Sequence, residues 1–172
     1  GTSKAGTPHS VRNALFKGVY EEHECDIVER IVKRGDRILE IGAGIGLVSL
    51  LATRLAGEGQ VLSCEANPAL EPLIRANYAL NGWMPNLRMG AVAAAAGEVS
   101  FHQNDNLLSS SRIDRKLAGK EITVEGNAIN DLIAAHEPNI IMDVEGSETE
   151  LLASADLSGV QSIIVEMHPH IV

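Results

Sequence analysis

The sequence has few cysteines, few aromatic residues and an excess of negative charge. Only Cys25 and Cys64 occur, far apart in the chain, so neither a disulfide framework nor a zinc site is predicted, and a reducing cytoplasm fits best. Aromatic residues make up 3% of the chain, too few to predict a stacking cage for a planar ligand. The 14 Lys and Arg residues are outnumbered by 23 Asp and Glu residues, a net charge of -9, which argues against a nucleic-acid partner.

Long apolar runs are missing as well. No run approaches the roughly 20 residues that span a bilayer, and the segment from Gly1 to Gly6 lacks the apolar core of a signal peptide. We therefore expect a soluble, cytoplasmic protein with no membrane partner. The length of 172 residues suits one domain that occupies residues 1–172, and we expect the small, polar residues 1–10 to lie outside the fold.

Patterns typical of strands and helices alternate along the chain. Apolar runs predict strands at 37–41, 60–65, 87–92, 98–103, 121–125, 140–144 and 162–166. Helical spacing and capping residues predict helices at 21–34, 47–55, 67–82, 130–136 and from 147 onward. This order predicts an α/β fold with a doubly wound, mainly parallel sheet, helices on both faces and a small antiparallel excursion. In such sheets ligands bind at the carboxyl ends of the strands, where the strand order reverses.

Three glycines alternate directly after the first predicted strand, in Glu40-Ile41-Gly42-Ala43-Gly44-Ile45-Gly46. Glycine permits positive φ and a close approach of the backbone to a ligand. A dinucleotide site would favour Gly-x-Gly-x-x-Gly, which aims helix N–H groups at a pyrophosphate, but position 47 is Leu. The spacing therefore favours a ligand without phosphates, and Glu40 could accept hydrogen bonds from a cationic amino group. The alternative is a tight turn that binds nothing.

Acidic residues also stand at the ends of later strands. Glu65 ends the strand at 60–65, where a carboxylate can accept hydrogen bonds from both ribose hydroxyls of an adenosine, although it could also be a solvated strand end. Asp143 and Glu145 lie at the end of 140–144, and like charges so close raise at least one pKa unless a cation is nearby. The segment from Ser147 to Glu150 has the pattern of a capping box that opens a helix.

With these motifs in view, the chain resembles the FkbM family of S-adenosylmethionine-dependent methyltransferases from about Gly18 to Pro169. The most specific segment is Ile-Met-Asp-Val-Glu-Gly-Ser-Glu at 141–148, supported by the glycine segment at 40–46 and by Val-Glu-Met-His-Pro at 165–169. The resemblance implies a Rossmann-like class I fold and methyl transfer, usually to a hydroxyl oxygen of a small metabolite or sugar. It also implies a helix and a hairpin after the last strand, so we expect either a shortened chain or a sheet edge closed by a partner, which leaves a homo-oligomer open.

The resemblance also assigns cofactor-binding roles to individual residues. They follow the strands or lie in the segment before the first helix, where Glu21 and His23 accompany Tyr20 and also fit a plain helix start. Those near the glycine segment would bind the methionine end, Glu65 the ribose and the next strand the adenine, with Asp143 beside the methyl group. The implied set is Tyr20, Glu40, Gly42, Ala43, Gly44, Glu65, Ala66, Asn67, Ala91, Val92 and Asp143.

An alcohol acceptor must lose its proton, so a base within hydrogen-bond reach is expected. The catalytic candidates are Asp143, Glu145 and His168, because all three should lie at the carboxyl ends of neighbouring strands; we favour Asp143 or His168. His168 could instead be a turn residue before Pro169, and Glu145 could complement the dipole of the following helix. The three could hold Mg²⁺, but nothing in their spacing demands it, so no metal is predicted.

Two other functions compete with methyl transfer. A nucleotide-dependent oxidoreductase predicts Gly-x-Gly-x-x-Gly, which is absent from the glycine segment. A cofactor-binding module without catalytic activity predicts cofactor binding with no transfer to any acceptor. The serines at 109–111 belong to the polar loop at 104–111, and they could contact cofactor or acceptor or form a solvated turn.

Overall fold

The structure is a computed structural model that describes residues 9–104, 119–136, 138–144 and 146–168. The predicted serines at 109–111 and the candidate base Glu145 lie outside the described residues. The elements in chain order are α1 (His9–Lys17), α2 (Glu22–Ile31), β1 (Ile38–Ile41), α3 (Leu47–Ala56), β2 (Val61–Glu65), η1 (Pro68–Leu70), α4 (Glu71–Ala79), β3 (Asn86–Met89), β4 (Ala91–Ala93), β5 (Gly97–Asn104), β6 (Gly119–Ala128), α5 (Ile129–His136), β7 (Asn139–Met142), α6 (Glu148–Ser154) and β8 (Ile163–Val165).

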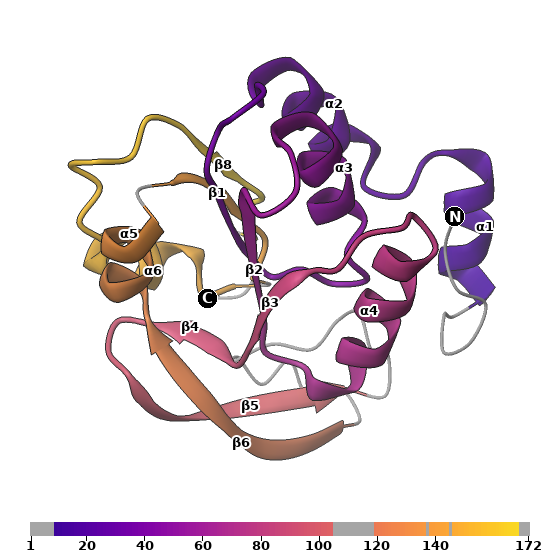
Figure 1. The fold of residues 1–172 in the computed structure, drawn as a ribbon. Coiled ribbons are helices and arrows are strands. Elements are labelled where there is room, and N and C mark those ends of the chain that lie inside the picture. Colours follow the sequence, from indigo (N-terminus) through magenta and orange to yellow (C-terminus); the bar gives the residue numbers. More distant parts are fainter. Residues whose placement is uncertain (1–8, 105–118, 137, 145, 169–172) are drawn as a thin grey trace.

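The main sheet has five parallel strands in the order β3-β2-β1-β7-β8 (Figure 1). The chain runs outward from β1 to β3 and then returns to the other side of β1, so the order reverses between β1 and β7. Ile41 pairs with Cys64 of β2 and with Met142 of β7. The carboxyl ends of these strands are therefore level, and the loops that follow them open at one edge, as the predicted doubly wound fold requires.

Helices cover both faces of this sheet (Figure 1), with α2, α3 and α4 on one face and α5 and α6 on the other. The alternation of side chains along a strand explains how β1 serves both layers. Leu39 and Ile41 belong to the cluster that contains the apolar residues of α5 and α6. Ile38 belongs to the opposite cluster, which contains Val28 of α2 and Val48 of α3. All the strand residues of β1 are buried, as expected for a central parallel strand.

The predicted strand at 87–92 is two strands that belong to different sheets. The break falls at Gly90, which has φ 135° and lies so close to β6 that a Cβ there would stand 2.6 Å from the Glu125 carbonyl oxygen. After it, β4 joins a second sheet in the order β4-β6-β5, parallel to β6, while β5 and β6 are antiparallel. The predicted antiparallel excursion is therefore present, and it also recruits the segment expected to flank the adenine.

The two predicted helix starts behave differently. Asn67 caps as expected, because its side chain accepts a hydrogen bond from the Ala69 N–H at 3.1 Å, and one 3₁₀ turn then leads into α4. The pattern at Ser147 does open a helix as predicted, with Ser147 at the N-cap of α6, but its side chain makes no capping bond. Within the described residues, no helix combines the length and the apolar character that crossing a membrane requires.

Candidate functional site

A cavity of about 280 Å³ opens at the level carboxyl ends of β1, β2 and β7. Its wall comes from the loops after these strands, from β4 and from the segment that enters α2. Of the implied cofactor-binding residues, those that line it are Tyr20, Glu40, Gly42, Ala43, Gly44, Glu65, Ala66, Ala91, Val92 and Asp143. Asn67 does not line it and instead caps the following helix, and His23 is exposed on α2 outside the cavity.

The glycines of the first loop serve two different purposes. At Gly42, with φ 92°, a Cβ would stand 1.7 Å from the Asp143 carbonyl oxygen, so glycine is required here by the backbone that directly follows β7. At Gly44, with φ 54°, the nearest atom to a Cβ would be Glu21 Oε1 at 3.8 Å, so this position is open. Sequence reasoning assigned both glycines to ligand approach, but only Gly44 has free space beside it.

Glu65 joins the first two loops. Its Oε2 accepts a hydrogen bond from the Gly44 N–H at 2.9 Å, and its Oε1 accepts one from the Asn67 N–H at 2.7 Å. Burial raises the pKa of Glu65 to about 7, against the opposing effect of these backbone donors. Each carboxylate oxygen has a second lone pair, so the side chain can still accept hydrogen bonds from a ligand in the cavity.

Glu40 is the most deeply buried carboxyl group in the lining, with 2% of its surface exposed. Its Oε2 has no hydrogen-bond partner among the described residues. Burial raises the pKa of Glu40 to about 8, and the nearby hydroxyls of Ser63 and Ser49 oppose the rise. An unpaired buried oxygen costs free energy unless something satisfies it, so this atom indicates a hydrogen-bond donor from a ligand.

The segment that enters α2 brings three more titratable groups to the cavity. Glu21 has φ 51° and ψ 31°, the left-handed conformation that non-glycine residues rarely adopt. Burial raises the pKa of Glu21 to about 8 and that of Glu24 to about 7, and the neighbouring Tyr20 phenol opposes the rise in the pKa of Glu21. Burial also raises the pKa of the Tyr20 phenol above its ordinary range. In the ligand-free chain, Tyr20 and Glu21 are therefore mainly protonated near neutral pH, whereas Glu24 is about half ionised.

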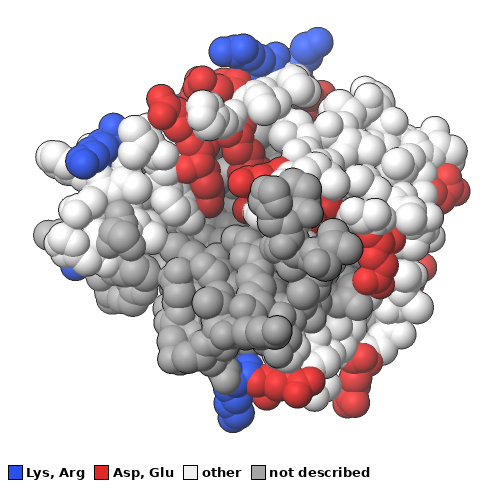
Figure 2. All heavy atoms as spheres, turned by 180° about the vertical axis from the view of Figure 1, so that it is seen from behind, with Lys and Arg blue, Asp and Glu red and all other residues white. Residues whose placement is uncertain are grey.

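The lining is strongly acidic. It includes the carboxyl groups of Glu21, Glu24, Glu40, Glu65, Asp143 and Glu166, and it includes no Lys or Arg among the residues that the structure describes. Figure 2 shows acidic side chains that extend inward from the upper edge of one face, whereas Lys and Arg lie at its periphery. Because a cation stabilises the ionised form of such carboxyl groups and a phosphate does not, this lining favours a cationic ligand over a phosphate.

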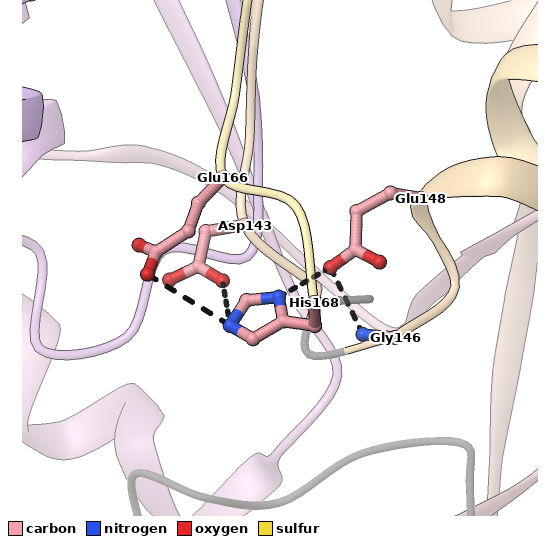
Figure 3. Close-up of polar contacts among 5 residues, drawn as sticks. All are labelled: Asp143, Gly146, Glu148, Glu166 and His168. Carbon is pink, nitrogen blue, oxygen red and sulfur yellow. Dashed lines mark hydrogen bonds and ion pairs between the residues drawn. The ribbon is translucent and has the colours of Figure 1, made fainter. Parts of the chain in front are cut away.

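The carboxyl ends of β7 and β8 bring Asp143 and His168 together, as the sequence predicted. His168 Nε2 lies 3.9 Å from Asp143 Oδ1 and 3.9 Å from Glu166 Oε1 (Figure 3). On the other side of the ring, Nδ1 lies 2.7 Å from Glu148 Oε1. Asp143 and Glu166 line the cavity, and His168 is next to both of them without lining it (Figure 3).

Sequence reasoning missed Glu24, Glu148 and Phe101. Glu24 lies three residues after Glu21 in the segment predicted as a helix at 21–34, and this spacing was the available signal. Glu148 was read as part of a capping box and so was given no role in the site. Phe101 is in the antiparallel excursion, where the only signal was the alternation of apolar and polar residues along β5. Asp143, Glu148 and His168 each place one atom within 4.8 Å of the others, but Glu148 and His168 already bond to each other. The expectation that no metal is required stays a prediction.

Comparisons with known proteins point to one class of enzyme. Residues 40–171 match the family model described as the methyltransferase FkbM domain. An arginine N(omega)-methyltransferase of Streptomyces achromogenes subsp. streptozoticus is 44% identical over 48 residues, which are 28% of this chain and 13% of that protein. The protein arginine N-methyltransferase 1.6 of Arabidopsis thaliana is 23% identical over 144 residues, 79% of this chain and 20% of that protein. The matched regions thus span at most a fifth of these relatives.

The family match includes both halves of the site. It begins at Glu40, directly before the glycines, and it continues past Asp143 and His168. It covers well over half of the chain, and the parallel sheet with its level carboxyl ends has the architecture that the resemblance implied. The chain belongs to the FkbM family of methyltransferases.

Proposed function

We propose that the cavity binds S-adenosylmethionine and that the chain transfers its methyl group to a hydroxyl oxygen of a small metabolite or sugar. The observation that carries this proposal is the buried, unpaired Oε2 of Glu40 in an acidic cavity without Lys or Arg among the described lining residues. S-adenosylmethionine presents an ammonium and a sulfonium to such a cavity, whereas a nicotinamide dinucleotide would present phosphates. The electrostatics therefore favour methyl transfer over the oxidoreductase alternative.

The residues present fit this cofactor. The carboxylate of Glu40 would accept hydrogen bonds from the ammonium, and the remaining lone pairs of Glu65 would accept them from the ribose hydroxyls. Ala91 and Val92 are buried and lie in the cavity wall beyond Glu65, where they would flank the adenine. When bound, S-adenosylmethionine supplies an electrophilic methyl group. Positioning and exclusion of water are then the main tasks of the protein.

For an alcohol acceptor, the chain must also supply a group that accepts the proton of the hydroxyl. Asp143 lies in the cavity wall, and His168 Nε2 lies 3.9 Å from its Oδ1. A hydroxyl held at this rim would deliver its proton to His168 Nε2 or to the Asp143 carboxylate, and the neighbouring Glu166 would stabilise the positive charge formed on the ring. We favour His168, because an imidazole titrates close to neutral pH.

A cationic nitrogen acceptor is a second candidate. Carboxylate oxygens of Glu24, Asp143 and Glu166 lie within 4.8 Å of one another, and such a group can accept several hydrogen bonds from a guanidinium. The two relatives are named as arginine methyltransferases, which agrees with this reading. The cofactor site would be the same, and only the acceptor would differ.

The test of the cofactor is titration calorimetry with S-adenosylhomocysteine. We expect micromolar binding to the intact chain, a loss of at least about tenfold, or 1.4 kcal/mol, in Glu65→Gln, and no change in Glu58→Gln, whose carboxylate is exposed in the turn after α3. No binding to a folded intact chain would contradict the proposal.

The acceptor is tested by incubating the chain with S-adenosylmethionine and two acceptor panels, one of sugars and polyols and one of arginine and simple guanidines. Methylated products are then identified by mass spectrometry. Methylation confined to the first panel supports the hydroxyl acceptor, and methylation confined to the second supports the cationic nitrogen. Binding of S-adenosylhomocysteine without transfer to any acceptor would instead favour a cofactor-binding module.

A further inference from the structure

We propose that Glu148 is a positioning residue, which holds the His168 ring so that Nε2 is directed toward Asp143 and Glu166 in the cavity wall. The proposal rests on the proposed function in one respect, because it takes His168 as the group that accepts the acceptor's proton. Neither the sequence motifs nor the family match assigned a role to this glutamate.

The first step of the argument is the fixed position of the Glu148 carboxylate. Glu148 is the first residue of α6, and only 3% of its side chain is exposed. Its Oε1 accepts a hydrogen bond from the Gly146 N–H at 2.9 Å, and the same oxygen lies 2.7 Å from His168 Nδ1 (Figure 3). A buried oxygen with two donors in fixed directions has little freedom to move, so it can hold an imidazole in one orientation.

The second step concerns the protonation of the pair. Burial alone would raise the pKa of Glu148, but hydrogen bonds from the N–H groups of Gly146 and Glu148 itself and from His168 outweigh burial and lower it. The side chain is therefore a carboxylate near neutral pH, and a carboxylate only accepts hydrogen bonds. His168 must then carry a hydrogen on Nδ1, so in the neutral ring the lone pair is on Nε2.

The third step is the surroundings of Nε2. It lies 3.9 Å from Asp143 Oδ1 and 3.9 Å from Glu166 Oε1, so two carboxylates stand beside this nitrogen. Both carboxylates line the cavity, and Glu24 lies close to both. Negative groups on every side of the ring favour its protonated form. The arrangement therefore suits an imidazole that receives a proton from the cavity and holds it while the methyl group is transferred.

A purely structural role is the alternative for Glu148. Its carboxylate could simply satisfy the Gly146 N–H at the start of α6, where Ser147 fails to cap. Such a role would lower stability on substitution but would leave the titration and the tautomer of His168 unchanged. The deciding measurement must therefore report on the His168 ring itself.

The experiment is a ¹⁵N NMR titration of the histidine rings in the full chain, with EDTA present to remove metal ions. The chain has six histidines, and the signals of His168 are identified by their absence in His168→Gln. In the unaltered chain we expect a neutral ring with hydrogen on Nδ1; hydrogen on Nε2 would overturn the proposal without any variant. In Glu148→Gln we expect the His168 midpoint to fall by about one pH unit and both tautomers to appear.

Two further variants complete the test. Glu58→Gln removes an exposed carboxylate from the turn after α3, outside the cavity lining, and should leave the His168 midpoint unchanged. Glu148→Asp keeps the charge on a shorter side chain and should restore the His168 midpoint at least in part, and it replaces Glu148→Gln if that variant fails to fold. An unchanged His168 midpoint and tautomer in a folded Glu148 variant would overturn the proposal.

Kinetics separates this inference from the proposed function. In Glu148→Gln we expect kcat to fall and the acidic limb of its pH profile to move down by about one unit, while the affinity for S-adenosylhomocysteine stays within about twofold. Transfer with an unaltered pH profile in Glu148→Gln contradicts the positioning role alone. The NMR changes without any cofactor binding contradict the proposed function and leave the geometric assignment supported.

Discussion

The cavity has two sides that differ in structure, one at the carboxyl ends of β1 and β2 and the other at the carboxyl ends of β7 and β8. At the carboxyl ends of β1 and β2, Glu40 and Glu65 are 2% and 7% exposed, and Glu65 accepts hydrogen bonds from backbone N–H groups. After β7 and β8, the side chains of Asp143 and His168 are 25% and 19% exposed, and that of Glu166 is 55% exposed. Here the contacts run between side chains. The first side is rigid and buried, and the second is more open.

This difference agrees with the two tasks of a transferase. A cofactor that returns in every cycle is held best by groups fixed to the backbone, because little entropy is then lost on binding. An acceptor has to enter and a proton has to move, which requires side chains with access to the cavity. The predictions below test whether the two sides are separate in function.

The largest effect on stability is expected where the loop after β1 contacts the backbone of Asp143, between the two sides. Gly42→Ala would place a Cβ 1.7 Å from the Asp143 carbonyl oxygen at φ 92°, so β1 and β7 would have to separate. We expect the free energy of unfolding to fall by about 4 kcal/mol or more, or the chain not to fold. Urea denaturation followed by circular dichroism measures this.

Gly59→Ala is the matched control. Its φ is 78°, but nothing lies within 4 Å of the added Cβ, so only backbone strain of about 1–2 kcal/mol is expected. Equal losses in the two variants would show that the contact between the Gly42 loop and Asp143 contributes little.

The next effect should be confined to the open side. In His168→Gln we expect kcat to fall by about 10²–10⁴-fold, because the proton acceptor is lost. The affinity for S-adenosylhomocysteine, measured by calorimetry, should change by less than about twofold, since His168 does not line the cavity. A parallel loss of affinity would show that the two sides act as one unit.

The buried side should make the free energy of unfolding depend on pH. Burial raises the pKa of Glu40 to about 8 from its ordinary 4.5, so between these values the folded chain holds a proton that the unfolded chain has released. Stability must then decrease as pH rises through this window, by up to about 1.4 kcal/mol per pH unit for this group. In Glu40→Gln this contribution disappears.

The measurement is urea denaturation of the ligand-free chain at pH 5 to 8. The free energy of unfolding of the intact chain should decrease more over this range than that of Glu40→Gln. Both proteins should still become less stable as pH rises, because the pKa values of Glu21, Glu24 and Glu65 are also raised. Identical slopes would mean that Glu40 is ionised in the folded chain.

The smallest effect is expected where the segment before α2 covers the cavity. Glu21→Gly removes the side-chain strain at φ 51°, but glycine also adds freedom to the unfolded chain, so stability should change by less than about 1 kcal/mol. Glu21→Gln keeps the strain and removes only the acidic group. A Gly variant far less stable than the Gln variant, as measured by urea denaturation, would show that contacts of this side chain outweigh its strain.

The sequence predicted the regular parts of this molecule well. The strands at 38–41, 61–65 and 139–142 are short apolar runs, and their order alone implied level carboxyl ends, where most of the predicted cofactor residues do meet. The break at Gly90 could not be predicted, because it depends on contact with β6, more than thirty residues later. The pairing of Glu148 with His168 likewise joins two distant segments, and the local pattern favoured a cap at Ser147 instead.

The contact between Gly42 and the Asp143 carbonyl affects how relatives of this chain should be recognised. Because the neighbouring strand demands this glycine whether or not a ligand binds, a descendant that had lost its cofactor would still retain it. The first glycine of the motif is therefore evidence of shared architecture, not of retained chemistry. Relatives that have kept the chemistry are better recognised by Glu40, whose buried Oε2 has no structural partner among the described residues. Once the cofactor was lost, this residue could be replaced by others during evolution.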